Sequence, residues 1–247
     1  MATVAVPPRV DVERRFFTAM VIAMAVTVLI GFAPSYFLRP AIGTPEFIRA
    51  VPLTPWVHVH AAVGTAWMVF LIWQANLIRS KQHQRHMANG LLGAGIALAV
   101  VVVGLILAID AGRAGRHPPS WTPTAFLVNP IAAITLFGGF VIAALWWRRR
   151  PDYHKRLMLI GTIAVIVPAM ARISTYWFKG ILPPSAIGGM ILSNLFLAAL
   201  VVYDLRKLGR LHPATLWGGG IMLLSQPARI WLSQTDAWNA FAARLIG

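Results

Sequence analysis

The fold is decided by long apolar runs such as residues 87–109, which read MANGLLGAGIALAVVVVGLILAI and contain no Lys, Arg, Asp or Glu. At roughly 1.5 Å per residue, a helix of this length covers about 33 Å, enough to cross a bilayer core of about 30 Å. Six further runs of similar length lie near 16–38, 56–78, 125–147, 157–178, 181–203 and 214–235. The sequence therefore predicts an all-α integral membrane bundle of seven transmembrane helices, forming one domain over residues 1–247.

The composition agrees with a membrane protein. Hydrophobic residues make up 58% of the chain and charged residues 12%, whereas soluble domains carry about a quarter charged residues. The net charge of +15 comes from basic residues between apolar runs, so we expect no binding to nucleic acid. The chain has no cysteine, which excludes disulfides, cysteine-ligated iron–sulfur clusters and covalent c-type haem. A metal or haem would need His, Met or oxygen ligands.

The distribution of Lys and Arg predicts the orientation. The N-terminal tail and the second, fourth and sixth loops carry 14 of these residues, and the opposite side carries 6. Excess positive charge marks the cytoplasmic side of a membrane protein. We therefore expect the N-terminus in the cytoplasm and the C-terminus outside, with the protein in a cytoplasmic (inner) membrane.

Two arginines lie within predicted spans. Arg172 and Arg229 each sit about 22 Å from the inner edge, in the outer third of the membrane. His60 and Asn129, on spans that run inward, fall about 6 Å below the outer edge, so all four residues could share one layer. One interpretation is that the arginines snorkel to the surface. The other is a cavity where both guanidinium groups hold a haem propionate, a carboxylate or a phosphate.

The second span begins with two histidines. His58 and His60 are two residues apart, about 200° around a helix, so they cannot both face one ligand. His60 does share a face with Gly64 and Met68, and a glycine beside a histidine leaves room for a porphyrin. The pattern is compatible with a haem ligand or with a hydrogen-bonded interfacial histidine. Other glycine clusters in the spans predict close helix packing or, alternatively, a flat ligand lying against them.

Further histidines lie at the cytoplasmic side. His83 and His86 precede the third span, and His154 opens the fifth. As neutral imidazoles these three could bind a haem iron or a divalent metal. The alternative is that they are solvated loop histidines near the lipid headgroups.

Several kinds of protein are excluded by absences. The chain has no Walker-type glycine loop, no H-E-x-x-H and no G-x-S-x-G. Its lysines all lie in or beside loops, which excludes a retinal Schiff base in the last span. No acid lies in the middle of a span, which argues against carboxylate-based ion or proton pumps. No enzymatic reaction is indicated.

The chain resembles a widespread bacterial family of multipass membrane proteins of unknown function. The resemblance covers nearly everything beyond the first span. The segments that carry it are His58-Val59-His60 with Gly64 and Trp67, His86 with Gly90, residues 151–158, Ala171-Arg172, residues 202–205, residues 212–219 and Gln226-Pro227-Ala228-Arg229. More loosely, it is similar to membrane b-type cytochromes that react with quinones or ascorbate. Those have four to six spans and paired histidines at two depths, whereas no second ligand for His60 is evident here.

Three functions follow as hypotheses. The first is a membrane redox protein that binds haem b or a quinone, with His60, or His86 with His154, as ligands or hydrogen-bond partners. In it Arg172 and Arg229 would neutralise propionates or a semiquinone. The second is a carrier or binder of a small anionic molecule or lipid. The third is an accessory or assembly subunit whose polar residues face a membrane protein partner.

Overall fold

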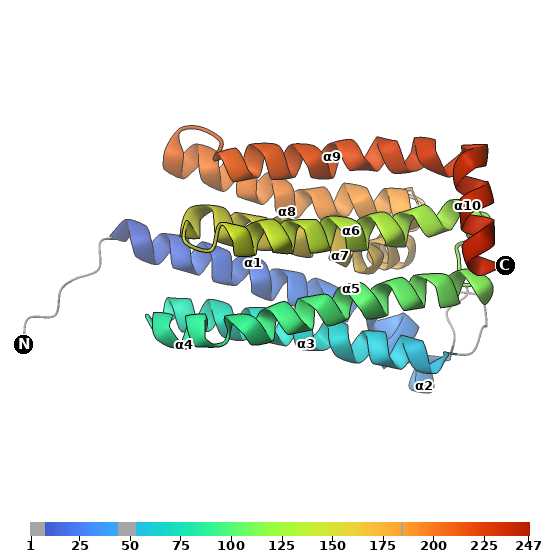
Figure 1. Ribbon diagram of the computed structural model, residues 1–247, viewed down its shortest axis with the longest axis horizontal. Coiled ribbons are helices and arrows are strands. Elements are labelled where there is room, and N and C mark those ends of the chain that lie inside the picture. Colours follow the sequence, from blue (N-terminus) through green and yellow to red (C-terminus); the bar gives the residue numbers. More distant parts are fainter. Residues whose placement is uncertain (1–7, 44–52, 184) are drawn as a thin grey trace, which may run out of the picture.

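The computed structural model describes residues 8–43, 53–183 and 185–247, and the secondary structure in these ranges is entirely helical. Figure 1 shows long helices running side by side, with one short helix across an end of the bundle. The elements are α1 (Pro8–Phe32), η1 (Ala33–Phe37), α2 (Arg39–Ile42), α3 (Pro55–Arg79), α4 (His83–Ala88), α5 (Gly90–Arg113), α6 (Pro123–Trp146), α7 (Pro151–Trp177), α8 (Ser185–Leu208), α9 (Pro213–Ser233) and α10 (Asp236–Ile246).

Proline and capping residues set where several helices begin. Pro55, Pro123, Pro151 and Pro213 each occupy the first turn, where the missing N–H costs no hydrogen bond. The side chain of Thr122 accepts a hydrogen bond from the Ala125 N–H and thereby caps α6. These signals place the start of α7 six residues before the predicted span, so His154 lies in its first turn.

Six helices in the described ranges are long and apolar enough to cross a membrane. They cover Val12–Phe37, Pro55–Arg79, Gly90–Arg113, Pro123–Trp146, Pro151–Trp177 and Ala186–Leu208. An all-helical multipass membrane protein is therefore confirmed at this level. The first span includes a π-helical turn at residues 33–37, and the predicted third span begins later because α4 is a separate helix.

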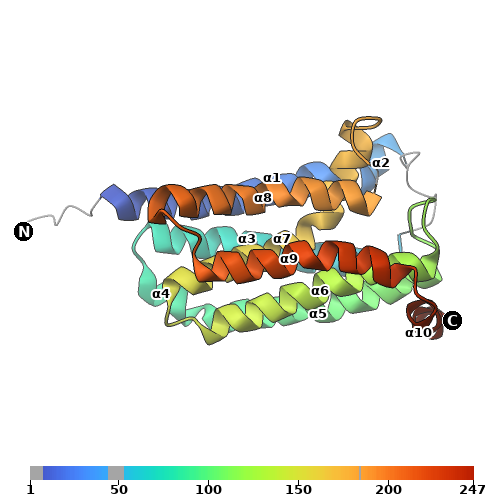
Figure 2. The ribbon, with the colours of Figure 1, turned by 90° about the horizontal axis from the view of Figure 1, so that it is seen from above.

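The seventh predicted span corresponds to α9, which is not among these six helices. Ser225, Gln226 and Arg229 lower the mean hydropathy of its second half. Nevertheless, α9 lies alongside the other long helices (Figures 1 and 2). The sequence did not predict α10, which is capped by the Thr235 side chain and crosses the end of the bundle. Its Trp238 indole donates to the Thr124 carbonyl at the start of α6.

The most buried helix is α7. Within its apolar segment 67% of the residues are buried inside the protein, against 22% in α5. Glycines let neighbouring helices approach it: an added Cβ at Gly31 or Gly189 would collide with the α7 backbone. Close packing therefore explains part of the glycine pattern. The same substitution at Gly64, Gly90 or Gly139 would meet no atom within 4 Å.

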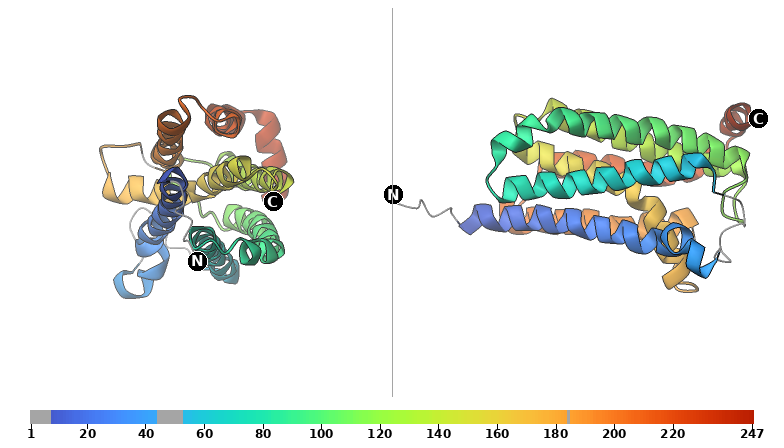
Figure 3. Two further views of the ribbon diagram at one scale, coloured as in Figure 1. Left: turned by 90° about the vertical axis from the view of Figure 1, so that its left-hand side faces the viewer. Right: turned by 90° about the horizontal axis from the view of Figure 1, so that it is seen from below.

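The chain alternates between the two ends of the bundle. The start of α1 and the connections α3–α5, α6–α7 and α8–α9 all lie at one end (Figure 3, right). These four segments are the ones rich in Lys and Arg, and we refer to this end as the basic end. The connection between α3 and α5 contains Lys81, whose φ of 61° lies in the left-handed region, and the six-residue helix α4.

Candidate functional site

Two histidines meet at the basic end of the bundle. His86 lies on α4 and His154 in the first turn of α7, and both side chains are half-buried. Their ring centroids are 6.2 Å apart and the ring planes are inclined at 84°. The two residues are far apart in the sequence, and the fold brings them together because the α3–α5 hairpin packs against α1 and α6, which in turn pack against α7.

A hydrogen bond fixes the orientation of the His154 ring. Its Nδ1 lies 2.9 Å from the carbonyl oxygen of Ala144, near the C-terminal end of α6. Carbonyls in the last turn of a helix lack intrahelical donors, so this oxygen is available to accept. A carbonyl cannot donate, so Nδ1 carries the proton. The lone pair of the neutral ring therefore lies on Nε2, the nitrogen that is free to bind a ligand.

The environment of His86 disfavours the charged form of its ring. Burial lowers the pKa of His86 below its usual 6.5, and the nearby His154 and His83 lower it further, while the Gln74 backbone opposes the shift. The Nδ1 atom of His86 is buried and has no hydrogen-bond partner among the described residues. His83 is exposed and belongs to no metal-binding cluster: the described residues contain no group of three or more His, Asp or Glu able to hold a metal ion.

Buried polar atoms without partners continue along α3. Gln74 is 6% exposed, and neither its amide nitrogen nor its amide oxygen has a hydrogen-bond partner within the described part of the chain. The indole nitrogen of Trp67, seven residues earlier on the same helix face, is also buried and unpaired. Most buried polar groups in proteins are satisfied, so such groups call for an explanation, for example a ligand. We refer to His86, His154, Gln74 and Trp67 as the histidine site.

His60 is not part of the histidine site. It precedes Gln74 by fourteen residues on α3, which places it about 21 Å away along the helix axis. Its ring lies within electrostatic reach of Arg172, and a Cβ on neighbouring Gly64 would point into open space. His58 is exposed and its Nδ1 shares a 2.9 Å hydrogen bond with the Tyr36 hydroxyl. The histidines at the start of α3 therefore lie toward the end of the bundle opposite the basic end, away from His86 and His154.

The two arginines predicted to share a cavity have separate partners. Arg172 donates to the Ser35 hydroxyl and to the Pro168 carbonyl, both at 3.0 Å, and its guanidinium stacks 4.4 Å from the Phe32 ring centre. It therefore packs against α1 and η1 rather than extending to the surface.

Arg229 is 3% exposed and makes one hydrogen bond, a 3.0 Å contact from Nη2 to the Ser225 hydroxyl of its own helix. Its Nε is buried without a partner within the described ranges, and Asp236 forms no ion pair with it. Asn129 is also buried and has an unpaired side-chain oxygen. Gln226 is satisfied by two amide hydrogen bonds with Asn194.

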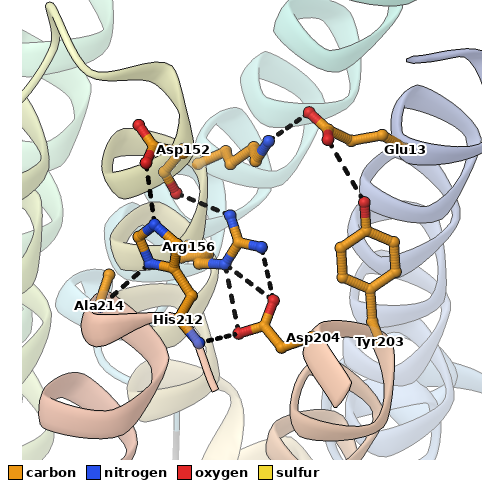
Figure 4. Close-up of polar contacts among 8 residues, drawn as sticks. Glu13, Asp152, Arg156, Tyr203, Asp204, His212 and Ala214 are labelled. Carbon is orange, nitrogen blue, oxygen red and sulfur yellow. Dashed lines mark hydrogen bonds and ion pairs between the residues drawn. The ribbon is translucent and has the colours of Figure 1, made fainter. Parts of the chain in front are cut away.

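A second polar network at the basic end is fully paired (Figure 4). Arg156 and Asp204 are buried, and the guanidinium Nη2 and Nε donate to the carboxylate at 2.5 and 3.1 Å. The other Asp204 oxygen accepts from the backbone N–H of His212 at 3.1 Å. The Nη1 of Arg156 donates to the Asp152 carbonyl at 3.0 Å. This network, which we call the arginine clamp, joins α7, α8 and the start of α9.

The ring of His212 is fixed by bonds at both nitrogens. Its Nδ1 accepts from the Ala214 N–H, so Nε2 carries the proton and donates to the Asp152 carboxylate at 2.9 Å. Beside the clamp, Lys155 forms an ion pair with Glu13 of α1, and the Tyr203 hydroxyl donates to the other Glu13 oxygen at 3.4 Å. Both His212 nitrogens are occupied, so this histidine supports the helix junction and has no free site for a ligand.

Sequence reasoning missed the arginine clamp. Arg156 was counted only as a positive charge that reports orientation, and Asp204 was not paired with anything. The available signal was an acid near the end of the sixth span, since a buried carboxylate needs a cationic partner. Comparison with family models, curated proteins and solved structures finds no match for this chain.

Proposed function

We propose that the protein is a redox protein of the bacterial cytoplasmic membrane that binds haem b between His86 and His154. The observation that carries the proposal is the spacing of the two rings, 6.2 Å between centroids. Two imidazoles that share one metal atom lie about 6 Å apart between ring centres, given metal–nitrogen bonds of about 2 Å and about 1 Å from each nitrogen to its ring centre. In this proposal His86 and His154 would supply the two protein ligands of the haem iron.

Three further features fit a haem. The Nδ1–H···O bond to Ala144 fixes His154 in the way that metal-bound histidines are usually held. The protein supplies two nitrogen ligands, which suits a metal whose other four ligands come from a porphyrin. The side chain of Gln74 is an unpaired polar group on α3, and an added Cβ at Gly90, four residues after His86, would meet no atom within 4 Å. A bound haem would supply one-electron transfer.

The membrane topology is part of this proposal. The 21 residues of α9 cover about 31 Å and run alongside the other helices, so we include α9 as a seventh span. The basic end then faces the cytoplasm, the N-terminus lies inside and α10 lies at the outer surface. As the electron partner we propose a quinone, because lipid-soluble carriers reach a site within a membrane bundle.

The test is a visible absorption spectrum of protein purified from cells with ample haem. We expect reduced haem bands in the wild type and their loss in His86→Ala and in His154→Ala. His83→Ala is the matched control, because His83 is an exposed neighbour of His86 on α4, and it should keep the haem. Colourless wild-type protein, or haem retained by both ligand variants, would refute the proposal. Haem lost only in His60→Ala would move the site to the outer end.

A second function is favoured by Arg229. This cation is 3% exposed and forms no ion pair with any acid in the described part of the chain, and a buried charge without a counter-charge is costly. An anionic molecule at this position would supply the missing partner, as a binder or carrier of small anions requires. Anion-dependent thermal stabilisation that is present in the wild type and absent in Arg229→Gln would favour this function over the redox one.

A further inference from the structure

A groove of about 380 Å³ lies between α6, α7 and α9, in the half of the bundle nearest the basic end. Its lining includes Gly139 and Phe140 of α6, Leu157 of α7, and Trp217 and Ile221 of α9. None of the lining residues is charged. Trp217 is 71% exposed and Ile221 49%, so this side of the groove faces the surroundings of the bundle, which for a membrane protein is the lipid.

A glycine keeps the groove open. A Cβ added at Gly139 would meet no atom within 4 Å, so a larger side chain there would project into the groove and not into a neighbouring helix. Gly218 differs, since its Cβ would lie 2.8 Å from Ile160 and it serves helix packing. A larger side chain at position 139 would therefore block the groove without disturbing the packing of the helices.

The mouth of the groove is cationic. Trp147 and Tyr153 line it, and between them in the sequence lie the exposed residues Arg148, Arg149 and Arg150. Arg148 donates to the Leu145 carbonyl, and the Arg150 guanidinium lies 5.8 Å from the Tyr153 ring centre. Neither arginine forms an ion pair with an acid among the residues that the structure describes. The nearby acid is Asp152, whose carboxylate is already engaged by His212.

We propose that this groove is a binding site for an anionic phospholipid. One acyl chain fills the apolar groove, and the phosphate headgroup lies against the three arginines at its mouth. Charge complementarity selects this occupant: clustered basic residues at a membrane surface attract anionic lipid headgroups, and arginine binds phosphate through paired N–H donors. An uncharged isoprenoid molecule would use the groove but gain nothing from the arginines. The inference is independent of haem.

The experiment is native mass spectrometry of the full chain in detergent, titrated with phosphatidylglycerol or phosphatidylethanolamine. We expect the anionic lipid to bind about tenfold more tightly in the wild type. Replacement of all three arginines by glutamine should remove this preference and leave a weak affinity equal for both lipids. Gly139→Leu should reduce binding of both lipids. Gly220→Leu is the matched control, because an added Cβ there also meets no atom within 4 Å but Gly220 does not line the groove.

The outcomes separate cleanly. Equal affinity of the wild type for both lipids would overturn the proposal, and so would phosphatidylglycerol binding that Gly139→Leu leaves unchanged. Recovery of a quinone in place of phospholipid from wild-type protein, and its loss from Gly139→Leu, would also overturn it. If Gly139→Leu does not fold while Gly220→Leu does, Gly139→Val in the same titration decides, with a smaller expected loss.

Discussion

The arginine clamp and the histidine site lie at the same end of the bundle, and both depend on residues of α7, yet their polar groups differ in one respect. In the clamp each buried charge has partners: Arg156 bonds to Asp204, and Asp204 accepts further from His212. In the histidine site His86 and Gln74 are buried with unpaired atoms. A complete network is sufficient for stability alone. An incomplete one costs stability, so its retention suggests a ligand that completes it.

The largest loss of stability is expected when one charge of the arginine clamp is removed, because the remaining charge then lacks its partner. Asp204→Ala leaves the Arg156 guanidinium buried without its counter-charge, and we expect a loss of about 3–5 kcal/mol in the free energy of unfolding. Thermal unfolding in detergent and the yield of folded protein would measure it. Asp236→Ala, which removes an exposed acid of α10, should cost less than about 1 kcal/mol.

A double substitution serves as the check on this prediction. Arg156→Met with Asp204→Leu removes both charges and should regain most of the stability that Asp204→Ala loses. If the double variant is as unstable as the single one, the clamp contributes more than mutual neutralisation of a buried pair.

The second prediction concerns the incomplete network. Gln74→Leu removes the unpaired amide, so cofactor-free protein should become more stable by about 1–3 kcal/mol. The same change should weaken haem binding in loaded protein. Melting curves of the cofactor-free and the haem-loaded protein, together with a haem titration, would measure the expected gain in cofactor-free stability and the expected loss of haem affinity. Gln84→Leu, at an exposed position of α4, should change neither. A less stable cofactor-free Gln74→Leu would place Gln74 with the complete network.

The third prediction is a pH dependence. The pKa of His86 is lowered by burial from its usual 6.5, so above that pH the folded and unfolded states are both neutral at this residue. As the pH falls below about 6.5, the unfolded chain takes up a proton that the folded chain does not. Stability should therefore fall on acidification, by at most about 1.4 kcal/mol for each pH unit. In cofactor-free protein the slope of melting temperature against pH should flatten most in His86→Gln and less in His83→Gln, because His83 supplies only part of the lowering of the His86 pKa.

The smallest expected effect belongs to the ion pair beside the clamp. The side chains of Lys155 and Glu13 are 22% and 43% exposed, so solvent screens the pair. Glu13→Gln should cost less than about 1 kcal/mol and keep the Tyr203 hydrogen bond. A shift in melting temperature as large as that of Asp204→Ala would show that Glu13 belongs to the clamp.

The sequence predicted the helices better than their contacts. Long apolar runs without charge identify spans directly, because the residues of such a run share the same apolar surroundings. The run at 214–235 contains Arg229 and Gln226, and hydropathy alone does not identify α9 as a span. Helix α10 was missed because eleven amphipathic residues are too few to stand out beside the spans.

Which candidate residues come together in space depends on contacts between helices, and no single stretch of the sequence contains that information. The sequence names His86 and His154 among several candidate histidines, but the distance between them depends on how the α3–α5 hairpin packs against α1 and α6. Depth along a helix predicts that Arg172 and Arg229 share one layer, yet depth does not say which way a side chain points. Arg172 turns to Ser35 of η1, which no periodicity in the sequence indicates.

Helix α4 has a consequence for how the protein matures. It is six residues long, is preceded by Lys81 in a left-handed conformation, and ends before α5 begins. One proposed iron ligand thus sits on a short hinged segment and the other on the most buried helix. All the long helices can therefore insert and pack before any cofactor arrives, and His86 then needs only a local movement to capture it. Iron ligation would then be the last step of maturation, and a chain without its cofactor would be most easily cleaved by proteases at α4, at the basic end of the bundle.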